Sequence, residues 1–154
     1  MANDVEPPQS TEADQGRATE QKESAPSRVQ KQPLVLVVED DARTLKLLGQ
    51  VLRRGGYRSG LAKNGIGAIK LLKKATPALI LLDIKMKPID GFELLTLLKR
   101  YPAARKIPVI ILTGRDNPLY IDKALEFGVE DYLIKPIQPR DLLDRIKGVV
   151  PPQK

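Results

Sequence analysis

The sequence predicts an α/β fold with a doubly wound parallel sheet, formed by one domain over residues 33–150. Short unbroken apolar runs, such as Leu34-Val-Leu-Val-Val38, alternate with segments in which apolar residues recur at helical spacing. Such runs are typical of parallel strands, which are buried on both faces. Polar residues follow four of the five predicted strands directly. Because ligands bind beyond the carboxyl ends of strands in these sheets, the polar residues predict a functional site there.

The predicted elements alternate strictly between strand and helix. A strand is expected where apolar or β-branched residues run together, and a helix where apolar residues recur every three or four positions. The predicted strands are 34–38, 57–61, 78–82, 107–112 and 131–134. The predicted helices that follow them are 42–54, 66–75, 91–100, 118–127 and 139–149.

Each of the first three helices carries an apolar stripe that we expect to face the sheet. The three stripes are Leu45, Leu48 and Leu52; Ile66, Ile69 and Leu72; and Phe92, Leu95 and Leu98. Gly55-Gly56 ends the first helix, and Pro77 ends the segment before the third strand. Pro118 opens the fourth helix as a favourable first-turn residue, and Gly128 ends it.

Five strand–helix units fit a flavodoxin-like (βα)5 fold with strand order 2-1-3-4-5. This order makes strands 1, 3, 4 and 5 neighbours. Those are the four strands that polar residues follow, whereas strand 2 carries none of this chemistry. The predicted topology and the predicted site therefore support each other.

Composition limits the classes of function. The 154 residues include no cysteine and no histidine, which excludes disulfides, thiolate or imidazole metal sites and a histidine base or phosphodonor. No apolar stretch reaches the roughly 18 residues of a membrane span, and the N-terminus lacks the apolar core of a signal peptide. We therefore expect a cytoplasmic protein without a membrane contact.

The ends of the chain differ from the domain in composition. Residues 1–32 contain four basic and six acidic residues and almost no large apolar ones, which predicts a disordered tail. Residues 151–154 form a short C-terminal tail after the domain. The net charge of +7 therefore comes from the domain. Its basic residues are scattered and no DNA-binding module is apparent, so nucleic-acid binding is not expected.

Acidic residues follow the first and third strands, namely Glu39, Asp40, Asp41 and Asp83. Carboxylates on adjacent strand ends repel one another unless a cation lies among them. Oxygen ligands without sulfur or nitrogen favour Mg²⁺ or a similar hard divalent ion. Taken alone, Glu39-Asp40-Asp41 is equally well explained as a helix cap with first-turn acids. We expect Asp41 to be that cap, and Glu39, Asp40 and Asp83 to bind the metal.

Asp83 is also a candidate nucleophile, because carboxylates can form aspartyl phosphates. Such chemistry needs Mg²⁺ and fixed donors around the phosphoryl oxygens. Thr113 supplies a hydroxyl after the fourth strand, and Lys135 supplies an ammonium after the fifth. Taken alone, Thr113 is explained as an ordinary strand-end threonine and Lys135 as a solvated lysine, but their joint placement favours a phosphoryl-transfer site.

Four segments in this order resemble the receiver domain of two-component response regulators over about residues 33–150. They are Leu34-Val-Leu-Val-Val-Glu-Asp-Asp41, Leu82-Asp-Ile-Lys-Met-Lys-Pro-Ile-Asp-Gly-Phe-Glu93, Ile107-Pro-Val-Ile-Ile-Leu-Thr-Gly-Arg-Asp116 and Asp131-Tyr-Leu-Ile-Lys-Pro136. Any one of these motifs is weak, but four with matching spacing are specific.

The resemblance implies a function for each matching residue. Asp83 would be the phosphoacceptor, and Glu39, Asp40, Asp83 and the backbone carbonyl of Lys85 would bind Mg²⁺. Thr113 would be the switch hydroxyl and Lys135 the lysine that pairs with the phosphate. Tyr132 matches the switch aromatic residue, and Gly114 the small residue that lets the phosphoryl group approach. One departure is Met86-Lys87-Pro88, where the family usually has proline directly after methionine.

The function expected from the resemblance is that of a stand-alone response regulator, and not of an enzyme. A histidine kinase or phosphotransfer protein would phosphorylate Asp83, and output would be a protein contact or onward phosphotransfer. A homodimer through helix 118–127, strand 131–134 and helix 139–149 is a further expectation.

Two alternatives remain. The first is a pseudo-receiver that binds partners without phosphorylation, which the altered loop keeps open. The second is an Mg²⁺-dependent phosphohydrolase with an aspartyl nucleophile. Such enzymes have Asp-x-Asp after the first strand, whereas here Asp83 follows the third and position 85 is lysine. Phosphate-binding glycine loops of nucleotide-binding proteins are absent from the sequence.

Overall fold

The computed structural model describes residues 32–86, 90–114 and 118–152, so residues 1–31 of the predicted tail and the Lys87-Pro88 departure lie outside it. Its strands are β1 (Leu34–Val38), β2 (Arg58–Ala62), β3 (Leu79–Asp83), β4 (Val109–Thr113) and β5 (Asp131–Ile134). Its helices are α2 (Ala42–Arg54), α3 (Gly65–Lys74), α4 (Gly91–Arg100), α5 (Pro118–Glu126) and α6 (Pro139–Val149). All strand pairs are parallel and the order is β2-β1-β3-β4-β5, which confirms the predicted fold.

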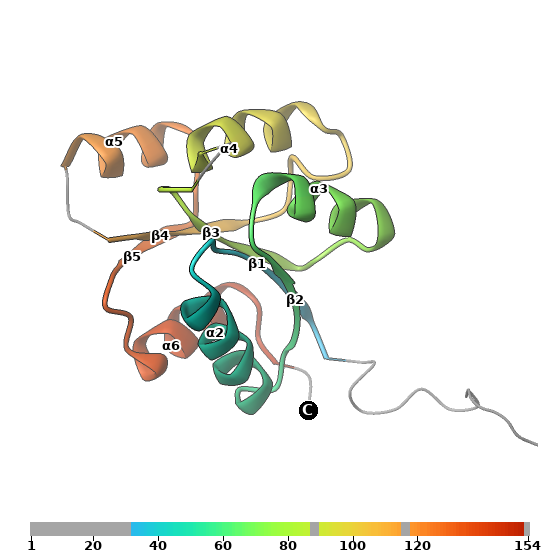
Figure 1. Ribbon diagram of the computed structural model, residues 1–154, viewed down its shortest axis with the longest axis vertical. Helices are drawn as coiled ribbons and strands as arrows, with labels where there is room; N and C mark the ends of the chain where they lie inside the picture. Colours follow the sequence, from blue (N-terminus) through green and yellow to red (C-terminus); the bar gives the residue numbers. More distant parts are fainter. Residues whose placement is uncertain (1–31, 87–89, 115–117, 153–154) are drawn as a thin grey trace, which may run out of the picture. The chain divides into compact units, whose positions relative to one another are not determined.

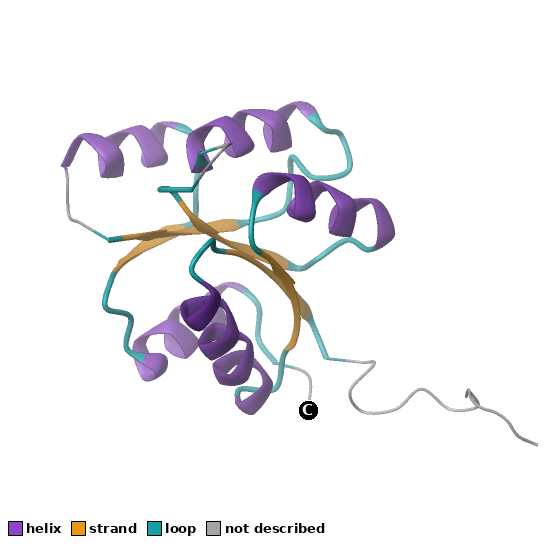
Figure 2. Cartoon of the chain, viewed as in Figure 1, coloured by secondary structure: helices purple, strands orange, loops and turns teal. Residues whose placement is uncertain are grey.

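The sheet lies between two layers of helices. Figures 1 and 2 show α3, α4 and α5 on one face and α2 and α6 on the other. Successive residues of β1 alternate between the two faces: Val35 and Val37 pack towards α2 and α6, and Leu36 and Val38 pack with the opposite cluster. Both faces of a central strand are therefore buried, which explains why its sequence is an unbroken apolar run.

Two strand ends differ from the prediction in a way that bears on the site. Asp83 and Thr113 are the last residues of β3 and β4, instead of the first residues after them. The parallel ladder continues through them, since Asp83 pairs with Leu112 and Thr113 with Ile134. Their backbones are thus fixed by the sheet, and only their side chains differ from the apolar run.

One predicted core residue is wrong. Ile66 was expected to face the sheet, but its side chain is 51% exposed. Residues three apart on a helix differ in direction by about 60°, so a stripe with that spacing drifts around the axis. The face that α3 turns towards the core is centred on Ala68, Ile69 and Leu72, and Ile66 falls outside it.

No helix among the described residues is long and apolar enough to span a membrane.

Candidate phosphorylation and metal site

The three acids that follow β1 have different surroundings. Glu39 is fully buried, and its backbone N–H donates to the carbonyl of Ala62 over 3.0 Å. Its carboxylate accepts a hydrogen bond from the N–H of Asp41 at 3.1 Å. Asp41 itself caps α2, because its side chain accepts from the N–H of Thr44 at 3.0 Å. Asp41 is therefore the predicted helix cap. Glu39 and the exposed Asp40 do not cap the helix and stay candidates for the metal site.

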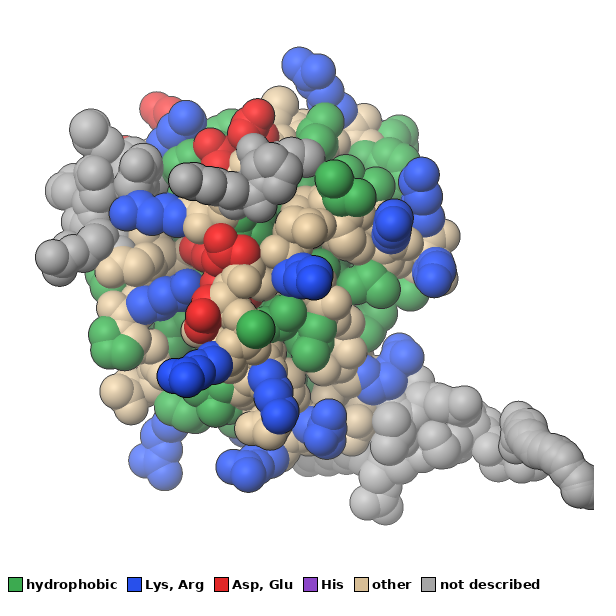
Figure 3. All heavy atoms as spheres, in the orientation of Figure 1, with side chains coloured by type: hydrophobic (Ala, Val, Ile, Leu, Met, Phe, Trp, Pro, Cys, Tyr) green, Lys and Arg blue, Asp and Glu red, His purple; other side chains and the backbone are tan. Residues whose placement is uncertain are grey.

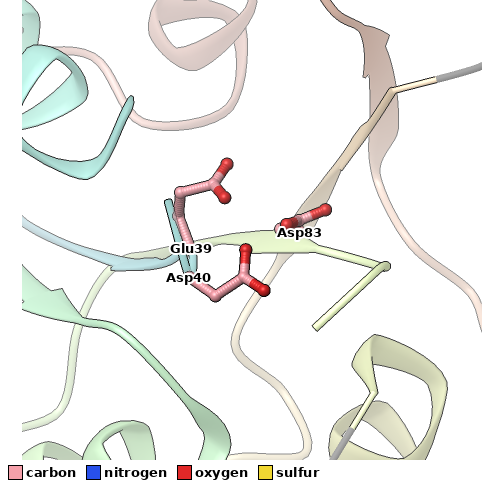
Figure 4. A group of neighbouring side chains, drawn as sticks. All are labelled: Glu39, Asp40 and Asp83. Atoms are coloured by element: carbon pink, nitrogen blue, oxygen red, sulfur yellow. The ribbon is translucent and has the colours of Figure 1, made fainter. Parts of the chain in front are cut away.

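Asp83 lies beside these acids at the end of β3, as Figure 4 shows. One carboxylate oxygen from each of Glu39, Asp40 and Asp83 lies within 4.8 Å of the others. Asp83 is only 3% exposed, and its Oδ1 accepts a hydrogen bond from the N–H of Lys85 at 3.1 Å. The structure thus brings together all three carboxylates that the sequence placed at the site.

The pleat of the sheet explains why the side chains of Glu39 and Asp83 lie near Lys135. Leu79 and Leu81 of β3 pack on the side of α2 and α6, so alternation sends Asp83 to that same side. By the same rule, Glu39 points to the same side as Val37, two residues before it, and Lys135 to the same side as Leu133. The side chains of Glu39, Asp83 and Lys135 therefore converge at the carboxyl ends of β1, β3 and β5.

Lys135 is the cation of this cluster. Its Nζ lies 2.5 Å from Oε1 of Glu39 and 3.7 Å from Oδ2 of Asp83. Burial alone would lower the pKa of the ammonium. The hydrogen bond to Glu39 and the charges of Asp83, Glu39 and Asp40 outweigh burial and raise the pKa of Lys135. Lys135 is therefore held in its charged form.

The pKa of Asp83 is raised, as expected of a buried carboxyl group with too little positive charge beside it. Burial, with the charge and hydrogen bonding of Glu39, raises the pKa of Asp83 to about 7, against the opposing effects of Lys135 and the Lys85 N–H. A positive charge added beside Asp83 would favour its ionised form.

The donor set fits a hard divalent cation. All three side-chain ligands are carboxylates, and two of them are buried beside one lysine. The chain has neither cysteine nor histidine that would favour a softer metal. Three carboxylates and one ammonium leave a net negative charge when all are ionised, which a divalent ion would neutralise.

Thr113 and Tyr132 lie towards the other layer of helices. Thr113 is 1% exposed, and pleat alternation places it on the side of Val109 and Ile111. Tyr132 of β5 is half-buried and packs against the same cluster. The backbone carbonyl of Thr113 accepts from the N–H of Lys135 at 2.7 Å, so β4 and β5 stay paired up to the site.

Gly114 follows Thr113 at the edge of the described chain. A Cβ atom added to it would meet nothing within 4 Å. Within the described part of the chain, nothing therefore crowds the residue to which the family resemblance assigned phosphoryl access.

Two interactions, one within the site and one at the start of β5, were not predicted. The direct pairing of Lys135 with Glu39 is one, since the sequence suggested only a phosphate partner for the lysine. The other is Arg145 of α6, whose Nη1 lies 2.8 Å from Oδ1 of Asp131 and 3.2 Å from the carbonyl oxygen of Tyr132. The spacing of Asp141 and Arg145 signals a pair within α6, but nothing in the sequence connects Arg145 to β5.

Comparison with known proteins agrees with this geometry. The family model for the response regulator receiver domain matches residues 35–147. The transcriptional regulatory protein AfsQ1 of Streptomyces coelicolor is 37% identical over 118 residues, which cover 77% of this chain and 51% of that protein. The phosphate regulon transcriptional regulatory protein PhoB of Escherichia coli is 36% identical, with 75% and 51% covered. This chain thus spans about half the length of these curated relatives.

Solved structures show the same fold. The chemotaxis protein CheY4 of Vibrio cholerae has a TM-score of 0.73 at 25% identity, and the match covers 77% of this chain and 98% of that one. A putative response regulator from Chloroflexus aurantiacus also has a TM-score of 0.73, at 30% identity, with 77% and 98% covered. With the strand order, the acidic cluster and the family match in agreement, the chain belongs to the response regulator receiver domain family of two-component signalling.

Proposed function

We propose that this protein is a phosphorylation switch in which Asp83 accepts a phosphoryl group. The observation that supports it most directly is the arrangement around Asp83. The ammonium of Lys135 lies 3.7 Å from the buried carboxylate. A carboxylate oxygen of Asp83 also lies within 4.8 Å of one oxygen each from Glu39 and Asp40. A nucleophile, a fixed cation and two further oxygen ligands are what phosphoryl transfer requires.

The donor would be a phosphohistidine of a histidine kinase or phosphotransfer protein, as is typical of the receiver domain family. In the transfer, a carboxylate oxygen of Asp83 forms a bond to phosphorus. The bond between phosphorus and the donor's imidazole nitrogen breaks, and its electron pair stays with the imidazole. The acceptor must be ionised for this step, so groups that favour the charged form of Asp83 would promote transfer.

Mg²⁺ is the cation that we propose for the acidic cluster. Glu39, Asp40 and Asp83 would hold it, and the backbone carbonyl of Lys85 would be a further ligand. When bound, the ion would neutralise charge on the phosphoryl oxygens. Asp40 is the most accessible of the three carboxylates, so it can be changed without opening the core.

After transfer, Thr113 and Lys135 would each bind a phosphoryl oxygen. Lys135 already lies between Glu39 and Asp83, so it needs to move little to do so. Thr113 and Tyr132 share the side of the sheet that α5 covers. We therefore expect the change to reach the face formed by α5, β5 and α6, where a partner or a second copy of the chain would bind.

The experiment is intact mass spectrometry after incubation with acetyl phosphate and Mg²⁺. Wild type should gain one phosphoryl group, and Asp83→Asn should gain none. A full gain in Asp83→Asn would contradict the assignment. Steady turnover of a small phosphate ester without a stable adduct would favour the phosphohydrolase. No adduct in wild type, under conditions in which another receiver is labelled, would favour a phosphorylation-independent binding module.

A further inference from the structure

An apolar groove lies between α3 and α4, separate from the residues of the acidic site. It has a volume of about 160 Å³ and is lined by Ile69, Leu72, Leu97, Leu98 and Tyr101. A cavity of about 150 Å³ can hold a benzene molecule, so the groove has room for an apolar side chain. Figure 1 shows the two helices side by side on one face of the sheet.

Part of the groove wall is open to solvent in the free chain. Leu97 is 43% exposed and Tyr101 is 44% exposed. The two residues are four positions apart, so they follow each other along one side of α4 and its C-terminal end. Large apolar side chains that stay exposed beside a groove are typical of an interaction surface.

The two helices that form this groove, with the turn after α4, are strongly basic in sequence. The exposed or half-buried cations of α3, α4 and the turn after them are Lys70, Lys73, Lys74, Lys99, Arg100, Arg105 and Lys106. The only acid within the two helices is Glu93, in the first turn of α4, where it accepts a hydrogen bond from the N–H of Asp90 in a capping box. In Figure 3, hydrophobic and basic side chains lie next to one another over α3.

Cations in the last turn of a helix also complement its dipole, which accounts for Lys73 and Arg100 individually. The dipole does not account for the open apolar groove, whose lining residues Leu72 and Tyr101 are the chain neighbours of Lys73 and Arg100. Charge of one sign beside exposed apolar walls instead selects a partner with the opposite charge and a matching apolar ridge.

We propose that the α3–α4 groove binds an acidic amphipathic helix of a partner protein. Apolar side chains one turn apart on that helix would fill the space between Leu72 and Leu97. Aspartate or glutamate residues flanking them would pair with Lys73 and Arg100. The groove would thus give the receiver a docking surface of the helix-in-groove kind, in addition to the face of α5, β5 and α6.

The test uses the full chain and a fluorescein-labelled synthetic peptide. The peptide is an amphipathic helix with leucines four residues apart and glutamates on both flanks, and fluorescence anisotropy measures its binding. Lys73→Glu with Arg100→Glu should weaken binding by at least about tenfold, and Leu97→Ser should do the same. Both matched controls lie on α2. Arg53→Glu with Arg54→Glu changes the net charge as much as the Lys73 and Arg100 pair does. Leu47→Ser matches Leu97→Ser, because it removes a leucine that is 51% exposed. Both controls should stay within about twofold of wild type.

Several outcomes would overturn the proposal. Equal weakening by the α2 pair would show that the peptide senses only net charge. Equal binding of a peptide with lysines in place of the glutamates would remove the charge argument. An absence of saturable binding would also reject it. If wild type dimerises and Leu97→Ser abolishes the dimer, the groove binds a second copy of the chain. If the chain binds DNA and only the double variant at Lys73 and Arg100 loses this binding, the groove region binds nucleic acid.

Discussion

The ammonium of Lys135 donates a hydrogen bond of 2.5 Å to a carboxylate oxygen of Glu39, 96 positions away in the sequence. Glu39 is fully buried, so this lysine supplies the positive charge that its carboxylate faces inside the protein. The same Nζ lies 3.7 Å from Asp83. Lys135 therefore has a structural role in the unphosphorylated chain, where it pairs with Glu39. The proposed contact with a phosphoryl oxygen would be a second role of the same ammonium.

Replacing Lys135 should destabilise the apo protein more than the loss of an ordinary surface lysine. Lys135→Met keeps the aliphatic length but leaves Glu39 and Asp83 without their cation. Leaving a buried polar group without its partner costs about 1–3 kcal/mol. Urea unfolding in EDTA at pH 8 measures this cost, and saturating Mg²⁺ should restore part of it. Lys147→Met, at an exposed position of α6, is the control. Equal losses in the two variants would show that the contact with Glu39 contributes nothing.

The raised pKa of Asp83 predicts a pH dependence of stability in the absence of metal. Below the unfolded pKa of 3.8 both states are protonated; between 3.8 and about 7 only the folded state keeps the proton. The contribution of Asp83 is therefore fully favourable at low pH and is lost as the pH rises through 7. The unfolding free energy of wild type relative to Asp83→Asn should fall by about 1–3 kcal/mol from pH 4.5 to 8.

Urea unfolding of both proteins across this range, in EDTA, provides the measurement. Titrations of distant groups cancel in the difference between the two proteins. Saturating Mg²⁺ should flatten the curve, because an adjacent cation favours ionised Asp83. A pH-independent difference in EDTA would show that Asp83 is not perturbed in this way.

Metal binding should depend on Asp40 but not on its neighbour Asp41. Millimolar Mg²⁺ should raise the melting temperature of wild type, because the ion binds only the folded cluster. Asp40→Asn should weaken Mg²⁺ binding by about tenfold, through the loss of one charged ligand. It should also stabilise the apo protein slightly by relieving repulsion with Asp83.

Asp41→Asn is the matched control for Asp40→Asn. It removes the same charge one residue away, and asparagine caps helices as well as aspartate does. Isothermal titration with Mg²⁺ compares the two variants. Equal affinities in both would mean that the metal responds to the general negative charge, and that Asp40 is not a ligand.

The sequence was sufficient for the fold and for the meeting of Glu39, Asp83 and Lys135, because parallel topology determines both. Once strands 1, 3 and 5 are placed in one sheet, Glu39, Asp83 and Lys135 must meet at its carboxyl end. The details that the sequence missed depend on side-chain packing between distant elements. Ile66 matched an apolar spacing yet lies outside the buried face of α3. The contact between Arg145 and Asp131 depends on how α6 packs beside β5, which no local pattern encodes.

Residues 1–31 should contribute little to the stability of the domain. They carry few large apolar side chains, so they have little surface to bury against it. A chain that begins at Gln32 retains the hydrogen bond from Nε of Arg58 to the carbonyl oxygen of Gln32 at 3.0 Å. Its melting temperature and its labelling by acetyl phosphate should match those of the full chain. A melting temperature lower by several degrees would show that the N-terminal residues pack on the domain.

Two glycines in helices should respond in opposite ways to substitution by alanine. A Cβ at Gly91, the first residue of α4, would lie 2.6 Å from the Cα of Ile84 and 2.8 Å from the carbonyl oxygen of Asp83. The N–H of Gly91 also donates to the carbonyl of Ile84 at 2.8 Å, which holds α4 against the residue after Asp83. Gly91→Ala should therefore push α4 away from β3 and cost about 1–3 kcal/mol.

Gly148, near the end of α6, lies where an added Cβ atom would meet no described atom within 4 Å. Gly148→Ala should stabilise the protein by about 0.5–1 kcal/mol, because alanine loses less backbone entropy in a helix. Urea unfolding measures both variants, and acetyl phosphate labelling reports on Asp83. Gly91→Ala should also slow labelling, since the clash falls on the backbone of the acceptor, whereas Gly148→Ala should leave it unchanged. Normal stability and labelling in Gly91→Ala would show that α4 can move away from β3 without cost, and that its contact with Ile84 does not position Asp83.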